Sequence, residues 1–97
     1  FEFANIPFIS CARKYADQGC FAGGAFDNKG HFGSKVNFAE SIDEQNQMLL
    51  FDPQTSGGLL LGVLQEKLES FIACAGELDQ AVWVVGSVET RSGIIVR

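Results

Sequence analysis

A chain of 97 residues with a formal net charge of −5 has room for one modest hydrophobic core, so we expect a single domain over residues 1–97. Twelve acidic residues outnumber seven Lys and Arg, and the basic residues form no stripe, which argues against nucleic acid as a partner. No apolar run approaches the ~20 residues of a membrane-spanning helix, so no membrane partner is expected either.

The first third of the sequence predicts the end of a strand followed by two helical segments. Residues 1–3 read as a strand end, and because the chain begins there without Met, we expect it to be a fragment of a longer protein. Apolar residues recur at helical spacing over 8–16, and Gly19 stands where that helix would stop. A polar segment over 23–33 predicts a short helix, weakened by internal glycines.

The middle of the chain predicts a short extended segment over 36–39 and a helix over 41–50. Ser41 is the expected N-cap of this helix, because Glu44 follows three residues later and completes a capping box.

The second half of the chain predicts strands around one helix. Residues 58–64 are almost all apolar, which is typical of a strand buried on both faces. Apolar residues at 3–4 spacing predict a helix over 65–75. Two β-rich runs, 82–88 and 93–96, are expected to form a hairpin with a turn over 90–93.

This order of elements predicts an α+β fold, with a mixed β-sheet and helices packed mainly on one face. The expected core combines the apolar strand, the helix after it and the later strand. Its predicted members are Leu59, Leu61, Leu68, Phe71, Ile72, Val82, Val84 and Phe8.

The chain offers few candidates for a nucleophile or a metal ligand. Cys11 and Cys74 lie among apolar residues and are expected to be buried structural thiols, whereas Cys20 precedes a Gly-Gly pair and is the better candidate for an exposed one. His31, the only histidine, is expected to be a solvated turn residue, and the acidic residues show no metal-loop spacing. We therefore expect no catalytic residue and no metal ligand in this chain. The odd, widely spaced cysteines favour a reduced, cytoplasmic setting.

Asp52–Gly58 is the most informative stretch of the sequence. Its two hydroxyls, its amide and its glycine pair can present several donors to an anion, because the N–H groups of such a turn converge. Asp52 itself would repel phosphate and is expected to order the turn, together with Pro53, by an Asx-type bond. The alternative is a plain turn that leads into a buried strand.

The stretch Asp52-Pro53-Gln54-Thr55-Ser56-Gly57-Gly58 resembles the signature of the selenophosphate synthetase (selenide, water dikinase) family. A second stretch, Cys20 to Asn28, resembles the Pro-Gly-Gly-Thr-x-x-Asn segment of that family, with Ala22 and Ala25 in place of its Pro and Thr. A third, Ala81 to Val88, resembles the closing strand of the family. The resemblance covers nearly the whole chain.

The resemblance implies the C-terminal domain of the aminoimidazole-ribonucleotide-synthetase-like superfamily, truncated here to its later part. It also implies a parent enzyme that makes selenophosphate from ATP, selenide and water with Mg²⁺, as a homodimer. The ATP-binding N-terminal domain, with its nucleophile and metal ligands, would be missing, so the fragment alone is expected to be inactive and to bind no cofactor.

Two polar segments are the candidate lining of a phosphate-binding cleft that faces the missing domain. They comprise Gly23, Gly24, Asn28, Gln54, Thr55, Ser56, Gly57 and Gly58. We expect at least one of the four glycines to have a positive φ or a backbone too crowded for a Cβ. The alternatives are a non-catalytic β-α-β ligand-sensing or interaction module, and a domain of another ATP-dependent enzyme of the superfamily.

Overall fold

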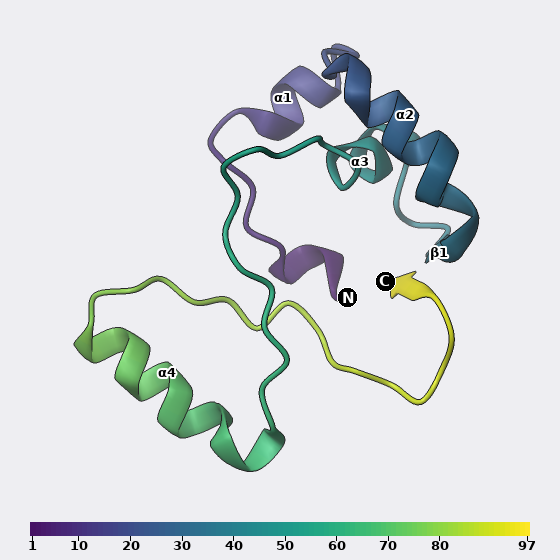
Figure 1. The fold of residues 1–97 in the computed structure, drawn as a ribbon. Coiled ribbons are helices and arrows are strands. Elements are labelled where there is room, and N and C mark those ends of the chain that lie inside the picture. Colours follow the sequence, from purple (N-terminus) through teal and green to yellow (C-terminus); the bar gives the residue numbers. More distant parts are fainter.

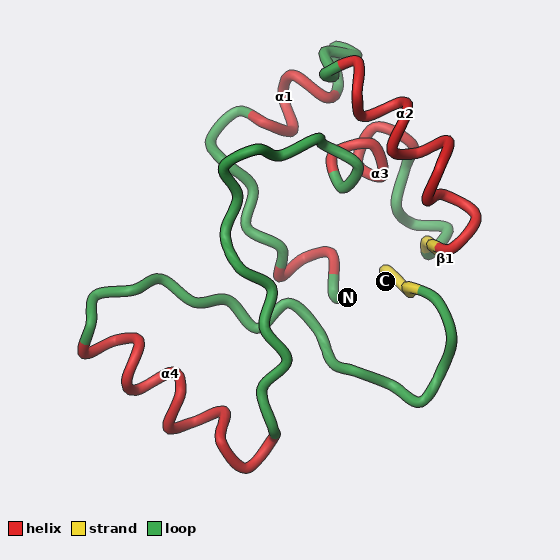
Figure 2. Tube along the Cα trace, in the orientation of Figure 1, coloured by secondary structure: helices red, strands yellow, loops and turns green.

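Four α-helices and two short strands make up the computed structural model, which describes all of residues 1–97 (Figures 1 and 2). The predicted α+β character is confirmed at this level. The helices are α1 (Ala12–Ala16), α2 (Gly23–Phe32), α3 (Glu44–Leu49) and α4 (Leu68–Glu77). The strands are β1 (Val36–Phe38) and β2 (Ile94–Val96), and single 3-10 turns lie at Phe3–Asn5, Gly33–Lys35 and Gln65–Lys67.

The helices lie where the sequence predicted them, but α1 is shorter than expected. Residues 8–11 stay outside it because Cys11 has a left-handed backbone with φ of 68°, which a helix cannot continue through. Gly19 follows α1 with φ of 72°, a conformation that costs glycine little, so its predicted role as the stop of this helix is confirmed.

The N-cap of α3 is Asp43 and not Ser41, so this prediction was wrong by two residues. One carboxylate oxygen of Asp43, Oδ1, accepts a hydrogen bond from the backbone N–H of Asn46 at 2.8 Å. The same oxygen accepts a second bond from the Asn46 side-chain amide at 2.9 Å. Asp43 directly precedes the first residue of the helix, so it and not Ser41 reaches the free N–H groups, and its charge also favours the helix N-terminus.

Replacing Asp43 by alanine is expected to lower the free energy of unfolding by about 1 kcal/mol, because an orphan N–H of α3 loses its acceptor. Ser41→Ala is the matched control and should change it by less than about 0.5 kcal/mol, since Ser41 is exposed and caps nothing. Urea unfolding of the two variants checks this. A larger loss of unfolding free energy in Ser41→Ala than in Asp43→Ala would show that Ser41 is the N-cap of α3.

The sheet is parallel, and it joins the two ends of the chain. Strand β1 pairs with β2, so that Val36 lies opposite Ile94 and Phe38 lies opposite Val96. The same hydrogen-bond pattern continues on the other side of β2, where the Arg97 N–H donates to the Phe1 carbonyl at 3.0 Å and the Phe3 N–H donates to the Arg97 carbonyl at 2.7 Å. The first residues therefore lie beside the last ones, as the N and C labels of Figure 1 show.

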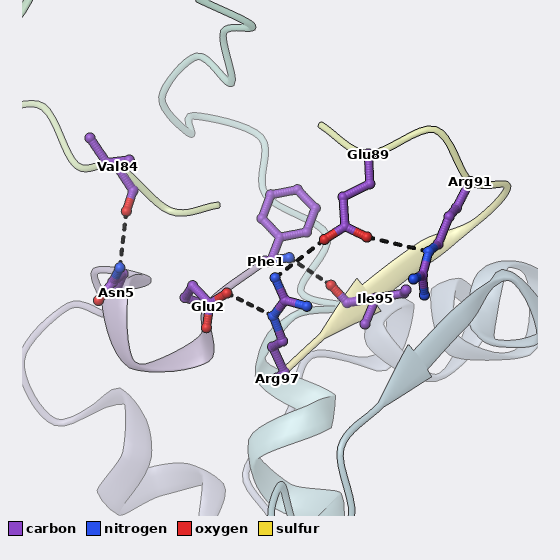
Figure 3. Close-up of polar contacts among 8 residues, drawn as sticks. All are labelled: Phe1, Glu2, Asn5, Val84, Glu89, Arg91, Ile95 and Arg97. Atoms are coloured by element: carbon purple, nitrogen blue, oxygen red, sulfur yellow. Dashed lines mark hydrogen bonds and ion pairs between the residues drawn. The ribbon is translucent and has the colours of Figure 1, made fainter. Parts of the chain in front are cut away.

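Ion pairs among charged side chains connect the two ends of the chain (Figure 3). Arg97 Nε lies 2.8 Å from Glu2 Oε1, and Arg97 Nη2 lies 3.3 Å from Glu89 Oε1. The hydrogen bond that Arg97 donates to Glu2, then the charge of Glu2 and that of Glu89, raise the pKa of Arg97. All three side chains are partly exposed, so the network orients the chain ends more than it stabilises them.

Two predicted strands are absent from the structure. Residues 58–64 and 82–88 are extended but form no ladder, and β2 pairs with β1 and with the first residues instead of forming a hairpin. The sheet is therefore parallel and two-stranded, not mixed. A strand pattern becomes a strand only when its backbone groups find partners, and these two segments find almost none within the chain.

The core lies among α1, α2, α3 and the sheet, not around α4 as predicted. Its buried residues are Ala16, Ala25, Ile42, Met48, Phe51 and Val96, while the seventh buried residue, Ala75, lies in α4. Of the predicted core, Leu59, Leu61, Ile72, Val82 and Val84 are exposed, and Leu68, Phe71 and Phe8 are half-buried. Figure 1 shows the reason, because α4 stands apart from the other three helices and has little to pack against.

Candidate functional site

The first turn of α2 is the N-terminal half of the candidate site. Ala22 precedes this helix and, having no polar side chain, caps none of its first N–H groups. Gly23 and Gly24 form the first turn itself, so their amides lack an intrahelical acceptor. Such groups carry the positive end of the helix dipole and favour an anion.

The loop after α3 lies directly against this turn. A Cβ placed on Gly24 would lie 3.1 Å from Cγ and 3.2 Å from Cβ of Pro53. These distances are tighter than normal contact, so a side chain at this position would push the proline ring away. The glycine at position 24 therefore lets the two conspicuous sequence motifs pack together.

Asn28, one turn further along α2, links this helix to the start of the same loop. Its side-chain amide Nδ2 donates a hydrogen bond to the backbone carbonyl of Phe51 at 2.9 Å. Phe51 is buried and immediately precedes Asp52, so the loop departs from a fixed point in the core. The sequence grouped Asn28 with the loop as a possible donor to a ligand, whereas in the structure one of its amide hydrogens already holds the loop.

The loop itself is a tight backbone turn with free polar groups. The Gln54 N–H donates to the backbone carbonyl of Asp52 at 2.8 Å. The Asp52 carboxylate makes no hydrogen bond within the chain, so the predicted Asx-type bond is wrong. Residues 52–58 are all exposed, and the hydroxyls of Thr55 and Ser56 have no partner among residues 1–97. Polar groups in this state are available to a ligand.

The four conspicuous glycines do not have a left-handed backbone. None of Gly23, Gly24, Gly57 and Gly58 has a positive φ, so the prediction, which allowed either a positive φ or a crowded backbone, is confirmed only through the crowding. The crowding part fits Gly24, whose neighbour is a rigid proline ring. At Gly57 the 2.6 Å contact is with Oε1 at the tip of the Gln54 side chain, which can move away at little cost.

Lys29, the only lysine of α2, is paired with a carboxylate and is therefore not free to bind an anion at the candidate site. Lys29 Nζ lies 2.7 Å from Glu44 Oε1 and joins α2 to the first turn of α3. The hydrogen bond from Lys29, and then its charge, lower the pKa of the Glu44 carboxyl. The candidate site thus offers neutral donors, and positive charge for a phosphate would have to come from another part of the protein.

The cysteines and the histidine lie elsewhere. Cys11, Cys20 and Cys74 are all free and exposed, which corrects the prediction of buried thiols at Cys11 and Cys74. His31 is exposed as predicted but lies in the last turn of α2 and not in a loop turn, and its ring contacts that of Phe32 edge to face, with centroids 4.6 Å apart. No group of three or more His, Cys, Asp or Glu could hold a metal ion within residues 1–97. None of the helices is both long and apolar enough to cross a membrane.

Comparison with known proteins identifies the relatives of the chain, although no family model matches it. Its sequence is 35% identical over 96 residues to a selenide, water dikinase of Pseudomonas aeruginosa, spanning 99% of this chain and 27% of the relative. Over its length, the chain belongs to the selenide, water dikinase family. A selenide, water dikinase of Caldanaerobacter subterraneus is 38% identical over 94% of the chain and 26% of the relative. That of Pelobacter propionicus is 40% identical over 72% and 20%.

The chain therefore spans about a quarter of the length of the selenide, water dikinases that it matches. The family predicted from Asp52–Gly58 and Cys20 to Asn28 is confirmed by these relatives. The site residues proposed from the same motifs stay a prediction, because similarity over the chain does not identify the side chains that contact a ligand.

Proposed function

We propose that this chain is the later part of the C-terminal domain of a selenophosphate synthetase, which makes selenophosphate, AMP and phosphate from ATP, selenide and water. The relatives support the family, and the match over a quarter of their length leaves room for a separate ATP-binding N-terminal domain. In this proposal the domain fold is that of the aminoimidazole-ribonucleotide-synthetase-like superfamily, the enzyme is a homodimer, and it works in the cytoplasm, where its three free thiols stay reduced.

The contact between Gly24 and Pro53 is the observation that carries the role of this chain. It brings an uncapped helix start and a loop with free hydroxyls to the same place, and the Asn28 amide fixes the loop there. In phosphoryl transfer the protein works by positioning and by stabilising charge on oxygen atoms. We infer that Thr55, Ser56 and the amides of Gly57 and Gly58 donate to phosphate oxygens.

ATP and Mg²⁺ fit the parent enzyme but not this chain alone. Mg²⁺ is held by carboxylates and phosphates, and no suitable cluster of carboxylates lies within residues 1–97. The N-terminal domain would have to supply the metal ligands, the nucleotide site and the positive charge. This chain would supply neutral donors on the opposite wall of the cleft.

An assay of the intact protein tests the proposal. With ATP, Mg²⁺ and selenide, we expect selenide-dependent formation of AMP and selenophosphate, followed by phosphorus NMR, and we expect none from the 97-residue chain alone. ATP consumption that is indifferent to selenide would contradict the proposed reaction. Turnover by the short chain would contradict its dependence on a second domain.

A further inference from the structure

Residues 58–88, which we call the arm, expose an unusual amount of apolar surface. The arm holds ten of the fifteen large hydrophobic side chains that are exposed in the chain, but only one of the seven buried residues, Ala75. Leu59 is 89% exposed and Val88 is 93% exposed. So many exposed apolar side chains in one stretch of the chain indicate a surface that another surface covers. The other eight exposed residues are Leu60, Leu61, Leu64, Ile72, Leu78, Val82, Trp83 and Val84.

The backbone of the arm is also unpartnered on both sides of α4. Residues 58–63 make no backbone hydrogen bond within the chain, and over 81–88 only the Val85 carbonyl accepts one, from the Glu2 N–H at 2.9 Å. Residues 58–63 hold three Leu and Val63, and residues 81–88 hold four Val and Trp83, so both segments are apolar, and the Val and Trp of the later one favour a sheet. Unpaired backbone on an apolar, extended segment is a template for another strand.

The later segment lies beside the first residues of the chain, at the edge of the sheet, although it forms no ladder there. Besides the bond to Val85, the side chain of Asn5 donates to the Val84 carbonyl at 3.2 Å (Figure 3). A Cβ on Gly86 would lie 2.9 Å from the Phe1 Cα, so only glycine permits this approach. Residues 84–86 thus lie next to residues 1–3, and their other edge is open.

We propose that the arm is an intramolecular docking surface for apolar β-strands of the same polypeptide, from the part that the present chain does not include. Nearly three-quarters of the length of the Pseudomonas aeruginosa relative lies outside the matched region, which is ample to supply such strands. A second copy of this chain fits less well. The arm carries four acidic residues and one lysine, so two arms would bring like charges together.

In the completed sheet, residues 58–63 and 81–88 pair with incoming strands, and the apolar side of α4, with Leu68, Phe71 and Ile72, covers one face. This accounts for the strand patterns that find no partner among residues 1–97. The inference depends on the family relationship and not on the proposed activity, so a protein that fails the selenide assay can still satisfy it.

Hydrogen exchange of the intact protein tests the docking surface. We expect the amides of 58–63 and 81–88 to be protected as strongly as those of β1 and β2, at protein concentrations where the protein is monomeric and where it is dimeric. Exchange at the rate of a free peptide would overturn the proposal. Protection that disappears on dilution to the monomer would overturn it in favour of a second copy.

A pair of variants provides an independent measurement. Leu59→Asp in the intact protein is expected to lower the melting temperature by roughly 5 °C or more, because it places a charge where an apolar strand docks. Ile9→Asp is the matched control, since Ile9 is 84% exposed but lies outside the arm, and it should shift the melting temperature by less than about 1 °C. Equal shifts in the two variants would contradict a docking role for the arm.

Discussion

Replacing Thr55 and Ser56 together by alanine in the intact protein is expected to lower selenophosphate formation at least tenfold. Both residues are exposed, and their hydroxyls bond to nothing within the chain, so their removal costs the fold little. A hydrogen bond to a charged group contributes about 1.5–3 kcal/mol, and about 1.4 kcal/mol corresponds to a factor of ten in rate. The melting temperature should therefore change by less than about 1 °C while turnover falls.

Ser34→Ala is the control for this double variant. Ser34 is also exposed and its hydroxyl makes no hydrogen bond, but it lies in the 3-10 turn after α2 and not in the loop. Its loss should leave both turnover and melting temperature unchanged. If the double variant behaved like the Ser34 variant, the loop would have only a turn-forming role, and the phosphate-binding assignment would be wrong.

Local features of this fold could be read from the sequence, because they depend on neighbouring residues. The start of α2 at Gly23, the left-handed Gly19 and the strand β1 all follow from spacing or from backbone freedom. The cap of α3 was misassigned because Ser41 and Asp43 are both competent caps, and only the path of the chain before the helix decides between them.

Long-range pairing could not be predicted in this way. The sequence gives no sign that residues 1–3 lie between β2 and residues 84–86, since that order depends on segments more than eighty residues apart. The patterns of 58–64 and 82–88 are those of strands, yet a pattern says nothing about whether a partner is present. The same limit explains why the predicted core around α4 was wrong.

The sequence identified the two segments of the candidate site, but it did not predict how they pack against each other. The two motifs, Gly23 to Asn28 and Asp52–Gly58, stood out by their composition alone. Their proximity, through Gly24 against Pro53 and Asn28 to Phe51, appears only in the structure. The role of Phe51 was missed because a buried phenylalanine before a polar loop looks like any other core residue.

Phe51→Ala is expected to be the most damaging single change outside the arm, at about 3–5 kcal/mol of unfolding free energy. Phe51 is 6% exposed, and its ring packs edge to face on that of Phe38 with centroids 6.0 Å apart. It also lines the apolar hollow under the sheet with Val36 and Val96. Alanine would leave a cavity there that helices and sheet cannot easily close.

The loss should extend to the loop, because the Phe51 carbonyl is the acceptor that Asn28 uses to hold it. Urea unfolding of the intact protein measures the stability term, and the selenide-dependent assay measures the effect on turnover. Phe32→Ala is the matched control, since Phe32 is about half exposed at the end of α2 and should cost less than about 1 kcal/mol. If the two phenylalanine variants lost the same stability, the core would not lie between α3 and the sheet. Phe51 would then not be the buried residue that holds the start of the loop in place.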